Sequence, residues 1–131
     1  MTRFVVDAGA VLHIVGSGLE VSDQHELLAP TLLRSQTLSL LHEAVHRGAL
    51  DAKDAQAQLK LVKGLPIRLL GDAVLRRKAW DLADQLGWAT TYDAEYVALT
   101  VLQADAFVTL DRDLARSVEG IVKTAPVDAL R

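Results

Sequence analysis

The chain has 131 residues, half of them hydrophobic and 24% charged, with a formal net charge of −3. This length and composition favour one globular domain spanning residues 1–131. The negative charge excludes nucleic-acid binding by bulk positive charge, so any contact with nucleic acid must be local or assisted by a metal. The low aromatic content, 5%, argues against single-strand binding on stacked rings.

The chain has no cysteine, which excludes disulfides, thiolate metal sites and cysteine nucleophiles. Its first apolar run is interrupted by Asp7 and His13, which does not fit a secretory signal. No segment approaches the length of a membrane span. We therefore expect a cytoplasmic protein with no membrane association.

The first half of the chain predicts one strand and two helices. Residues 3–6 are rich in β-forming side chains, and this run ends at Asp7. Residues 8–15 predict a short helix. Pro30 is expected at the first position of a long helix, and Gly48 at its C-terminal end.

The second half alternates between helical and extended patterns. Helices are expected from Asp51 to Lys63, around Leu75 to Leu86 with Gly87 as its stop, and from Asp93 onward. Short strands or extended segments are expected at 67–70, 89–92, 106–110 and 121–124. Strands that alternate with helices predict an α/β domain with a mostly parallel sheet.

Three aspartates follow predicted strands at the start of predicted helices: Asp7, Asp93 and Asp111. Each could be only an N-cap, which is a common role for aspartate. In an open parallel sheet, however, these positions meet at one edge, where ligands bind. Clustered carboxylates resist ionising together unless a cation joins them, and hard oxygen ligands suit Mg²⁺ or Mn²⁺.

Four segments together resemble the PIN domain, and more narrowly the VapC-type toxins of toxin–antitoxin pairs. These are VVDA at 5–8, PTLLRS at 30–35, YDAEYVAL at 92–99 and VTLD at 108–111. The resemblance implies a three-layer α/β/α sandwich with a mostly parallel central sheet. It further implies a Mg²⁺- or Mn²⁺-dependent endoribonuclease that cleaves structured RNA such as tRNA or rRNA, forms a homodimer and is blocked by a cognate antitoxin.

On this resemblance, Asp7, Asp93 and Asp111 form the metal site and carry catalysis. Thr109 would stand beside the last aspartate, where a hydroxyl can orient a ligand or a water. Asp113 is a further acid near the same edge, although a first-turn acid is also favoured by the helix dipole alone.

The sequence departs from the family at Gln36, where a glutamate is usual. An amide oxygen can still bind a metal or a metal-held water, but it supplies no charge. Glu43 lies on the same stripe of the helix, about 10 Å further along at 1.5 Å per residue. It could substitute only by reaching back, and its other interpretation is an ion pair with Arg47. Gln36 therefore leaves open a weak or inactive RNA- or antitoxin-binding module.

Two basic residues beside the last aspartate, Arg112 and Arg116, are one helical turn apart. This spacing makes them candidates for phosphate contact with RNA.

A further motif, His42-Glu43-Ala44-Val45-His46, matches the H-E-x-x-H pattern of zinc proteases. Such a site needs a third ligand, and the stretch directly after His46 supplies no histidine. Solvent-facing histidines are the alternative interpretation, and the zinc metalloprotease remains a second, competing hypothesis.

Overall fold

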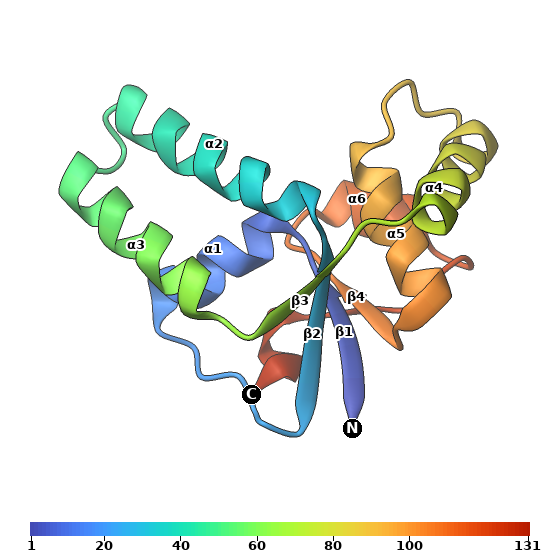
Figure 1. Ribbon diagram of the computed structural model, residues 1–131, viewed down its shortest axis with the longest axis horizontal. Coiled ribbons are helices and arrows are strands. Elements are labelled where there is room, and N and C mark those ends of the chain that lie inside the picture. Colours follow the sequence, from blue (N-terminus) through green and yellow to red (C-terminus); the bar gives the residue numbers. More distant parts are fainter.

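The computed structural model describes all residues 1–131 as a five-stranded parallel sheet with helices on both faces (Figure 1). The strands lie in the order β3-β2-β1-β4-β5, and every neighbouring pair is parallel. Their bounds are β1 Thr2–Val6, β2 His25–Pro30, β3 Ile67–Leu70, β4 Ala106–Val108 and β5 Thr124–Ala125. The predicted α/β/α architecture is confirmed.

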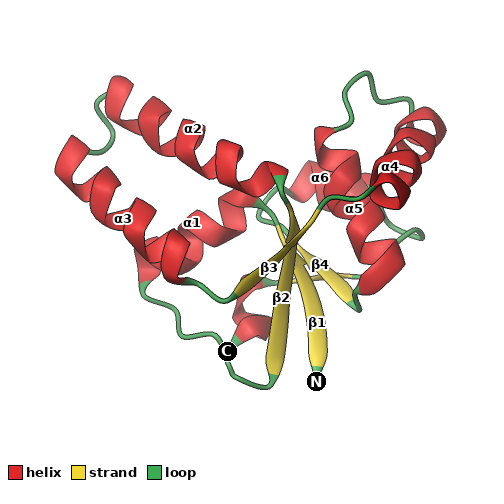
Figure 2. Ribbon diagram, in the orientation of Figure 1, coloured by secondary structure: helices red, strands yellow, loops and turns green.

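Helices α1 to α3 lie on one side of the sheet and the α4–α5 pair lies on the other (Figure 2). Right-handed crossovers explain this division, because the chain first moves from β1 outward to β3 and then returns across the sheet to β4. None of the helices has the length and apolar character needed to cross a bilayer. Their bounds are α1 Ala8–Ser17, α2 Leu32–His46, α3 Ala52–Gly64, α4 Ala73–Leu86, α5 Tyr92–Gln103, α6 Arg112–Ser117 and the 3₁₀ helix η1 Val127–Leu130.

The three central strands are buried on both faces, which explains their unbroken apolar runs. Residues 4–6 of β1, 27–29 of β2 and all of β4 are buried and belong to one core cluster. The helices contribute small and branched side chains to the same core. A single core of this kind fixes the strand ends, and therefore the residues that follow them.

Side-chain caps begin helices α1, α3, α4 and α6. Asp51 accepts a hydrogen bond from the Asp54 backbone N–H at 2.8 Å and begins α3, as predicted. Gly87 ends α4 in the left-handed region at φ 71°, which glycine adopts without strain. These signals depend on residues within one turn, so the sequence shows them directly.

Pro30 was predicted to begin a helix, and this was wrong. It is the last residue of β2 and pairs with Leu70 of β3, while α2 begins at Leu32. Beyond Pro30, the Thr31 backbone N–H donates to the Leu70 carbonyl at 3.1 Å. A proline fits a strand end, because one missing donor there costs little of the ladder. Residues 25–30 were not predicted as a strand, because only 27–29 are apolar.

The surroundings of Asp93 also differ from the prediction. Residues 89–92 form no strand, and Thr91 is the N-cap of α5. Asp93 therefore lies in the first turn of α5, and not directly after a strand. The last two strands are also shorter than predicted, since β4 ends at Val108 and β5 covers only Thr124–Ala125.

Candidate active site

The neighbouring strands β1 and β4 bring Asp7 and Asp111 to the same edge of the sheet. The pairing of Val6 with Val108 puts the two strand ends level, and the Asp7 backbone N–H donates to the Val108 carbonyl at 3.4 Å. From this pair the chain continues in opposite directions, from β1 toward β2 and from β4 toward β5. Such a switch point opens a crevice at the carboxyl ends of the strands, where α/β proteins bind ligands.

A pocket of about 670 Å³ lies in this crevice. Helix α2 supplies one part of its wall, the start of α5 another, and the segments after β1 and β4 the remainder. The three predicted aspartates all line it. The full lining is Asp7, Ala8, Gly9, Gln36, Ser39, Leu40, Glu43, Asp93, Tyr96, Leu110 and Asp111.

Asp7 is both a helix cap and a pocket residue. Its Oδ1 accepts from the Ala10 backbone N–H at 2.9 Å and so begins α1. The Thr109 hydroxyl donates to the same carboxylate. Thr109 Oγ1 in turn accepts from the Asp111 backbone N–H at 3.1 Å. Thr109 thus joins the two acidic strand ends, which is the position predicted for it beside the last aspartate.

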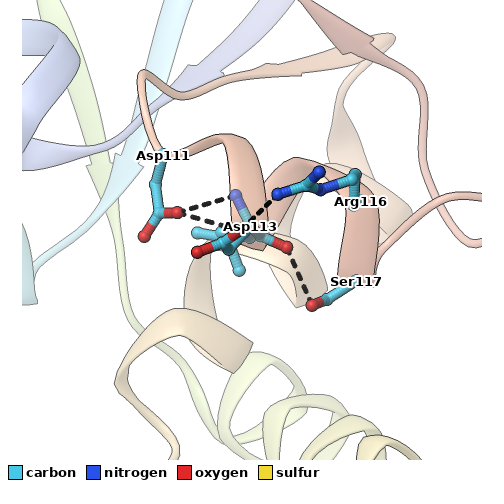
Figure 3. Close-up of polar contacts among 5 residues, drawn as sticks. Asp111, Asp113, Arg116 and Ser117 are labelled. Carbon is cyan, nitrogen blue, oxygen red and sulfur yellow. Dashed lines mark hydrogen bonds and ion pairs between the residues drawn. The ribbon is translucent and has the colours of Figure 1, made fainter.

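Asp111 likewise both caps a helix, α6, and lines the pocket (Figure 3). Its Oδ1 accepts from the backbone N–H groups of Asp113 and Leu114, each at 3.0 Å. Its Oδ2 has no hydrogen-bond partner in the chain. Capping and lining the pocket are therefore compatible roles, and the N-cap interpretation does not compete with a functional one.

The carboxylates repel one another across the pocket. The pKa of Asp7 is raised, mainly by burial and further by the charges of Asp93 and Asp111, although hydrogen bonds from Thr109 and the Ala10 backbone oppose the rise. The pKa of Asp93 is also raised, by partial burial first and then by Asp111. Both shifts mean that the ionised pocket is unfavourable without a compensating cation.

These shifts predict a pH dependence of stability for the metal-free protein. An acid whose pKa is higher in the folded state binds protons more tightly there, so its ionisation destabilises the fold as the pH rises through the raised pKa. We expect the melting temperature of the wild type to rise relative to that of Asp7→Asn as the pH falls from 7 through the raised pKa toward the ordinary value of 3.8. Calorimetry with EDTA measures this difference. A gap between the two proteins that stays constant from pH 7 down to the ordinary carboxyl pKa of 3.8 would contradict the pKa shift.

Gln36 is held by a residue that the sequence prediction missed, Tyr96. The Tyr96 hydroxyl donates to Gln36 Oε1 at 2.5 Å. Tyr96 is only 2% exposed, and its ring stacks on Phe107 with centroids 6.3 Å apart. Burial, followed by the charges of nearby acids, raises the pKa of Tyr96, so the hydroxyl stays protonated and remains a donor. The available signal was the spacing from Asp93, since residues three apart share a helix face.

Glu43 lines the same pocket as Gln36, as their shared stripe on α2 predicted. Its side chain is exposed and accepts from Ser39 Oγ at 3.4 Å. No ion pair with Arg47 forms, so that part of the prediction was wrong. Glu43 is therefore available to a ligand that enters the pocket.

Three other residues with a predicted functional role lie on α6 and do not line the pocket: Arg112, Asp113 and Arg116. Asp113 forms an ion pair with Arg116, and its carbonyl accepts from Ser117 Oγ at 2.9 Å (Figure 3). Asp113 is thus balanced by its own helix neighbour. Arg112 is exposed and makes no ion pair within the chain. Of the two arginines predicted to contact phosphate, Arg116 is paired with Asp113, whereas Arg112 has no ion-pair partner in the chain.

The oxygen atoms that line the pocket suit a hard cation that keeps part of its water shell better than one bound only by protein ligands. These oxygens come from carboxylates and one amide, which suits Mg²⁺ or Mn²⁺. No three histidine, aspartate or glutamate side chains lie close enough together to hold an ion between them. Mg²⁺ commonly keeps several waters and few protein ligands, which such an open arrangement allows.

The H-E-x-x-H motif lies at the C-terminal end of helix α2. His42 and His46 are exposed on α2, as the solvent-facing interpretation predicted. No third side chain joins them as a metal ligand. The geometry of α2 therefore offers no support for a zinc site.

Comparison with solved structures finds the same fold in three proteins, two of which are VapBC2 and the toxin VapC20. PAE2754 from Pyrobaculum aerophilum has a TM-score of 0.78 at 24% identity, over 98% of this chain and 92% of its own. VapBC2 from Rickettsia felis, bound to a DNA fragment from its promoter, has a TM-score of 0.68 at 7% identity over 95% and 98%. Mycobacterium tuberculosis VapC20, a sarcin–ricin loop cleaving toxin, has a TM-score of 0.60 at 15% identity over 87% and 94%.

No protein-family model and no curated protein matches the sequence. The chain shares its fold with these three proteins over almost its whole length, which agrees with the fold that the motifs implied.

Proposed function

We propose that this chain is a metal-dependent endoribonuclease and the toxin of a toxin–antitoxin pair. The main support is the convergence of Asp7, Asp93 and Asp111 on one pocket at the switch point of the sheet. The fold adds to this support, because VapC20, which shares it, is a toxin that cleaves the sarcin–ricin loop. Structured RNA such as tRNA or rRNA is accordingly the proposed substrate.

The three aspartates would hold Mg²⁺ or Mn²⁺, partly through water, and Gln36 or Glu43 would hold water at the same ion. The ion would neutralise phosphate charge and lower the pKa of a water nucleophile. Two neighbouring hydroxyl groups position side chains of the proposed metal site. Thr109 fixes the Asp7 carboxylate, and Tyr96 fixes the Gln36 amide.

Arg112 would contact a backbone phosphate next to the pocket. It follows Asp111 directly and is exposed, whereas Arg116 is paired with Asp113. Phosphate contacts of this kind position RNA without reading its sequence. The RNA sequence preference would then depend on other contacts.

The test is cleavage of a total small-RNA pool with Mn²⁺, with Mg²⁺ and with EDTA. We expect wild-type protein to cut in the presence of metal only, and Asp93→Asn to lose at least about a hundredfold of the rate, since one metal-binding charge is removed. Asp23→Asn is the matched control, because Asp23 is exposed and takes part in no ion pair. Cutting by Asp93→Asn at the wild-type rate would refute the proposed site.

A second function is favoured by one observation, the neutral amide at Gln36. With one charge fewer than a site containing glutamate, the pocket could bind RNA or an antitoxin without turnover. This module would retain RNA or antitoxin binding but show no cleavage with either metal. RNA retention on immobilised protein, measured beside the cleavage assay, distinguishes the two functions.

A protein antitoxin is the proposed partner in both cases. The support is the sequence resemblance to the toxins of toxin–antitoxin pairs, and VapBC2, which shares the fold, was crystallised bound to a DNA fragment from its promoter. The homodimer and a cytoplasmic location are also proposed, from the sequence resemblance and from the lack of membrane-spanning features respectively.

A further inference from the structure

A second cavity, here called the α2–α3 cavity, lies between α2, α3 and β3. Its volume is about 480 Å³, which is in the range of small-molecule sites. It shares no lining residue with the acidic pocket, so it is a separate site. The lining is Leu33, Arg34, Thr37, Leu59, Val62, Lys63, Leu65, Ile67 and Leu69.

The hairpin of α2 and α3 brings these residues together. The two helices lie side by side and run in opposite directions, so the start of α2 is next to the end of α3, which leads into β3 (Figure 1). The lining residues of α2 fall within 33–37 and those of α3 within 59–63, and each set covers one turn on one helix face. Ile67 and Leu69 alternate along β3, so they point to the same face of the sheet.

The inside of the α2–α3 cavity is apolar. Six of its nine lining residues are hydrophobic, and all of these except Leu33 are only half-buried. They pack on the core from one side and line the cavity with the other. The single neutral polar side chain is Thr37, whose hydroxyl already donates to the Leu33 carbonyl at 2.9 Å. The cavity therefore suits the apolar part of a ligand.

The two charged residues of the cavity are both cations without a partner. Arg34 and Lys63 are exposed, and neither takes part in an ion pair within the chain. Arg34 also lies in the first turn of α2, which contains no acid and where the helix dipole does not favour a positive charge. In a chain with a net charge of −3, this local pair of cations is complementary to an anionic group.

We propose that the α2–α3 cavity binds a small amphipathic anion, namely a free medium-chain carboxylate. Its alkyl chain would lie against the apolar side chains of α2, α3 and β3, where each buried methylene adds affinity. Its carboxylate would lie within reach of Arg34 and Lys63, since an arginine can bind both carboxylate oxygens at once. The cavity is separate from the acidic pocket, so the inference does not depend on RNA cleavage.

Isoleucine methyl NMR of the full chain tests the site directly. The chain has three isoleucines, Ile14, Ile67 and Ile121, and of these only Ile67 lines the α2–α3 cavity. In a titration with decanoate below its micelle-forming concentration, we expect a saturable shift of the Ile67 δ1-methyl signal and none of the other two.

Two further ligands test the two halves of the proposed chemistry. Octanoate lacks two methylene groups, so its dissociation constant should be about tenfold higher than that of decanoate. Decyltrimethylammonium has the same alkyl chain with a positive head group, and it should give no saturable shift at Ile67 because Arg34 and Lys63 repel it.

A pair of double variants tests the two cations. Arg34→Gln with Lys63→Gln should raise the dissociation constant of decanoate at least about tenfold, because both charge-assisted contacts are lost. Arg47→Gln with Lys60→Gln is the matched control, since it removes the same two charges at exposed positions outside the cavity. This control should bind decanoate like wild type. Unchanged methyl signals of Ile14 and Ile121 in the free variants would show that the fold is kept.

Four results would each overturn the proposal. These are no saturable shift of Ile67 with decanoate, equal binding of decyltrimethylammonium, equal loss of affinity in the two double variants, and wild-type affinity in the Arg34→Gln, Lys63→Gln protein. If an acidic helical peptide shifts Ile67 and decanoate does not, the cavity is a protein-docking site and the small-anion proposal is wrong.

Discussion

Asp7→Asn is expected to stabilise the metal-free protein and at the same time to reduce RNA cleavage by at least about a hundredfold. Asparagine is as good an N-cap as aspartate, so its Oδ1 can keep the bond from the Ala10 backbone N–H. The substitution removes a carboxylate whose pKa is raised by burial and by Asp93 and Asp111. The repulsion therefore falls, while the site loses a metal-binding charge.

Two measurements test whether Asp7→Asn raises stability and lowers activity together. Calorimetry in EDTA should show a higher melting temperature for the variant at pH 7, and cleavage assays in Mn²⁺ should show the lost activity. Asp51→Asn is the matched control, because Asp51 caps α3 in the same way and lies outside the pocket. Asp51→Asn should change neither the melting temperature nor the rate of RNA cleavage. An Asp7→Asn protein that cleaves RNA normally would show that the pocket is not the active site.

Gln36→Glu is expected to tighten Mn²⁺ binding by about tenfold and to lower the metal concentration needed for cleavage, because affinity for hard cations rises with ligand charge. The Tyr96 hydroxyl can donate to a glutamate as it does to Gln36, so the side chain should keep its place. Without metal, a fourth carboxylate adds repulsion, and the melting temperature should fall.

Isothermal titration with Mn²⁺ measures this effect directly, independently of activity. Gln58→Glu serves as the control, since Gln58 lies on α3 away from the pocket and gains the same charge. If Gln36→Glu binds Mn²⁺ no more tightly than wild type, the position is outside the ion's reach. If wild type is inactive and the variant cleaves RNA, the binding-module function is supported for the natural chain.

The sequence determined those parts of the fold and site that depend on near neighbours. Asp7 and Asp111 each follow an apolar β-forming run and precede a helix, so their caps and their place at a strand end were predictable. Asp51 and Gly87 were predictable for the same reason. A cap or a glycine turn is decided by backbone groups within about four residues, and these are adjacent in the sequence.

Only the tertiary structure decided which distant residues meet. The short apolar run at 27–29 became a strand because β1 and β3 pair with it on either side. Tyr96 meets Gln36 across 60 residues because the sheet holds α2 and α5 at one edge from opposite faces. Asp93 reaches the pocket from a helix turn, with no strand before it. Such contacts depend on how helices pack on the twisted sheet, and local spacing carries no information about that packing.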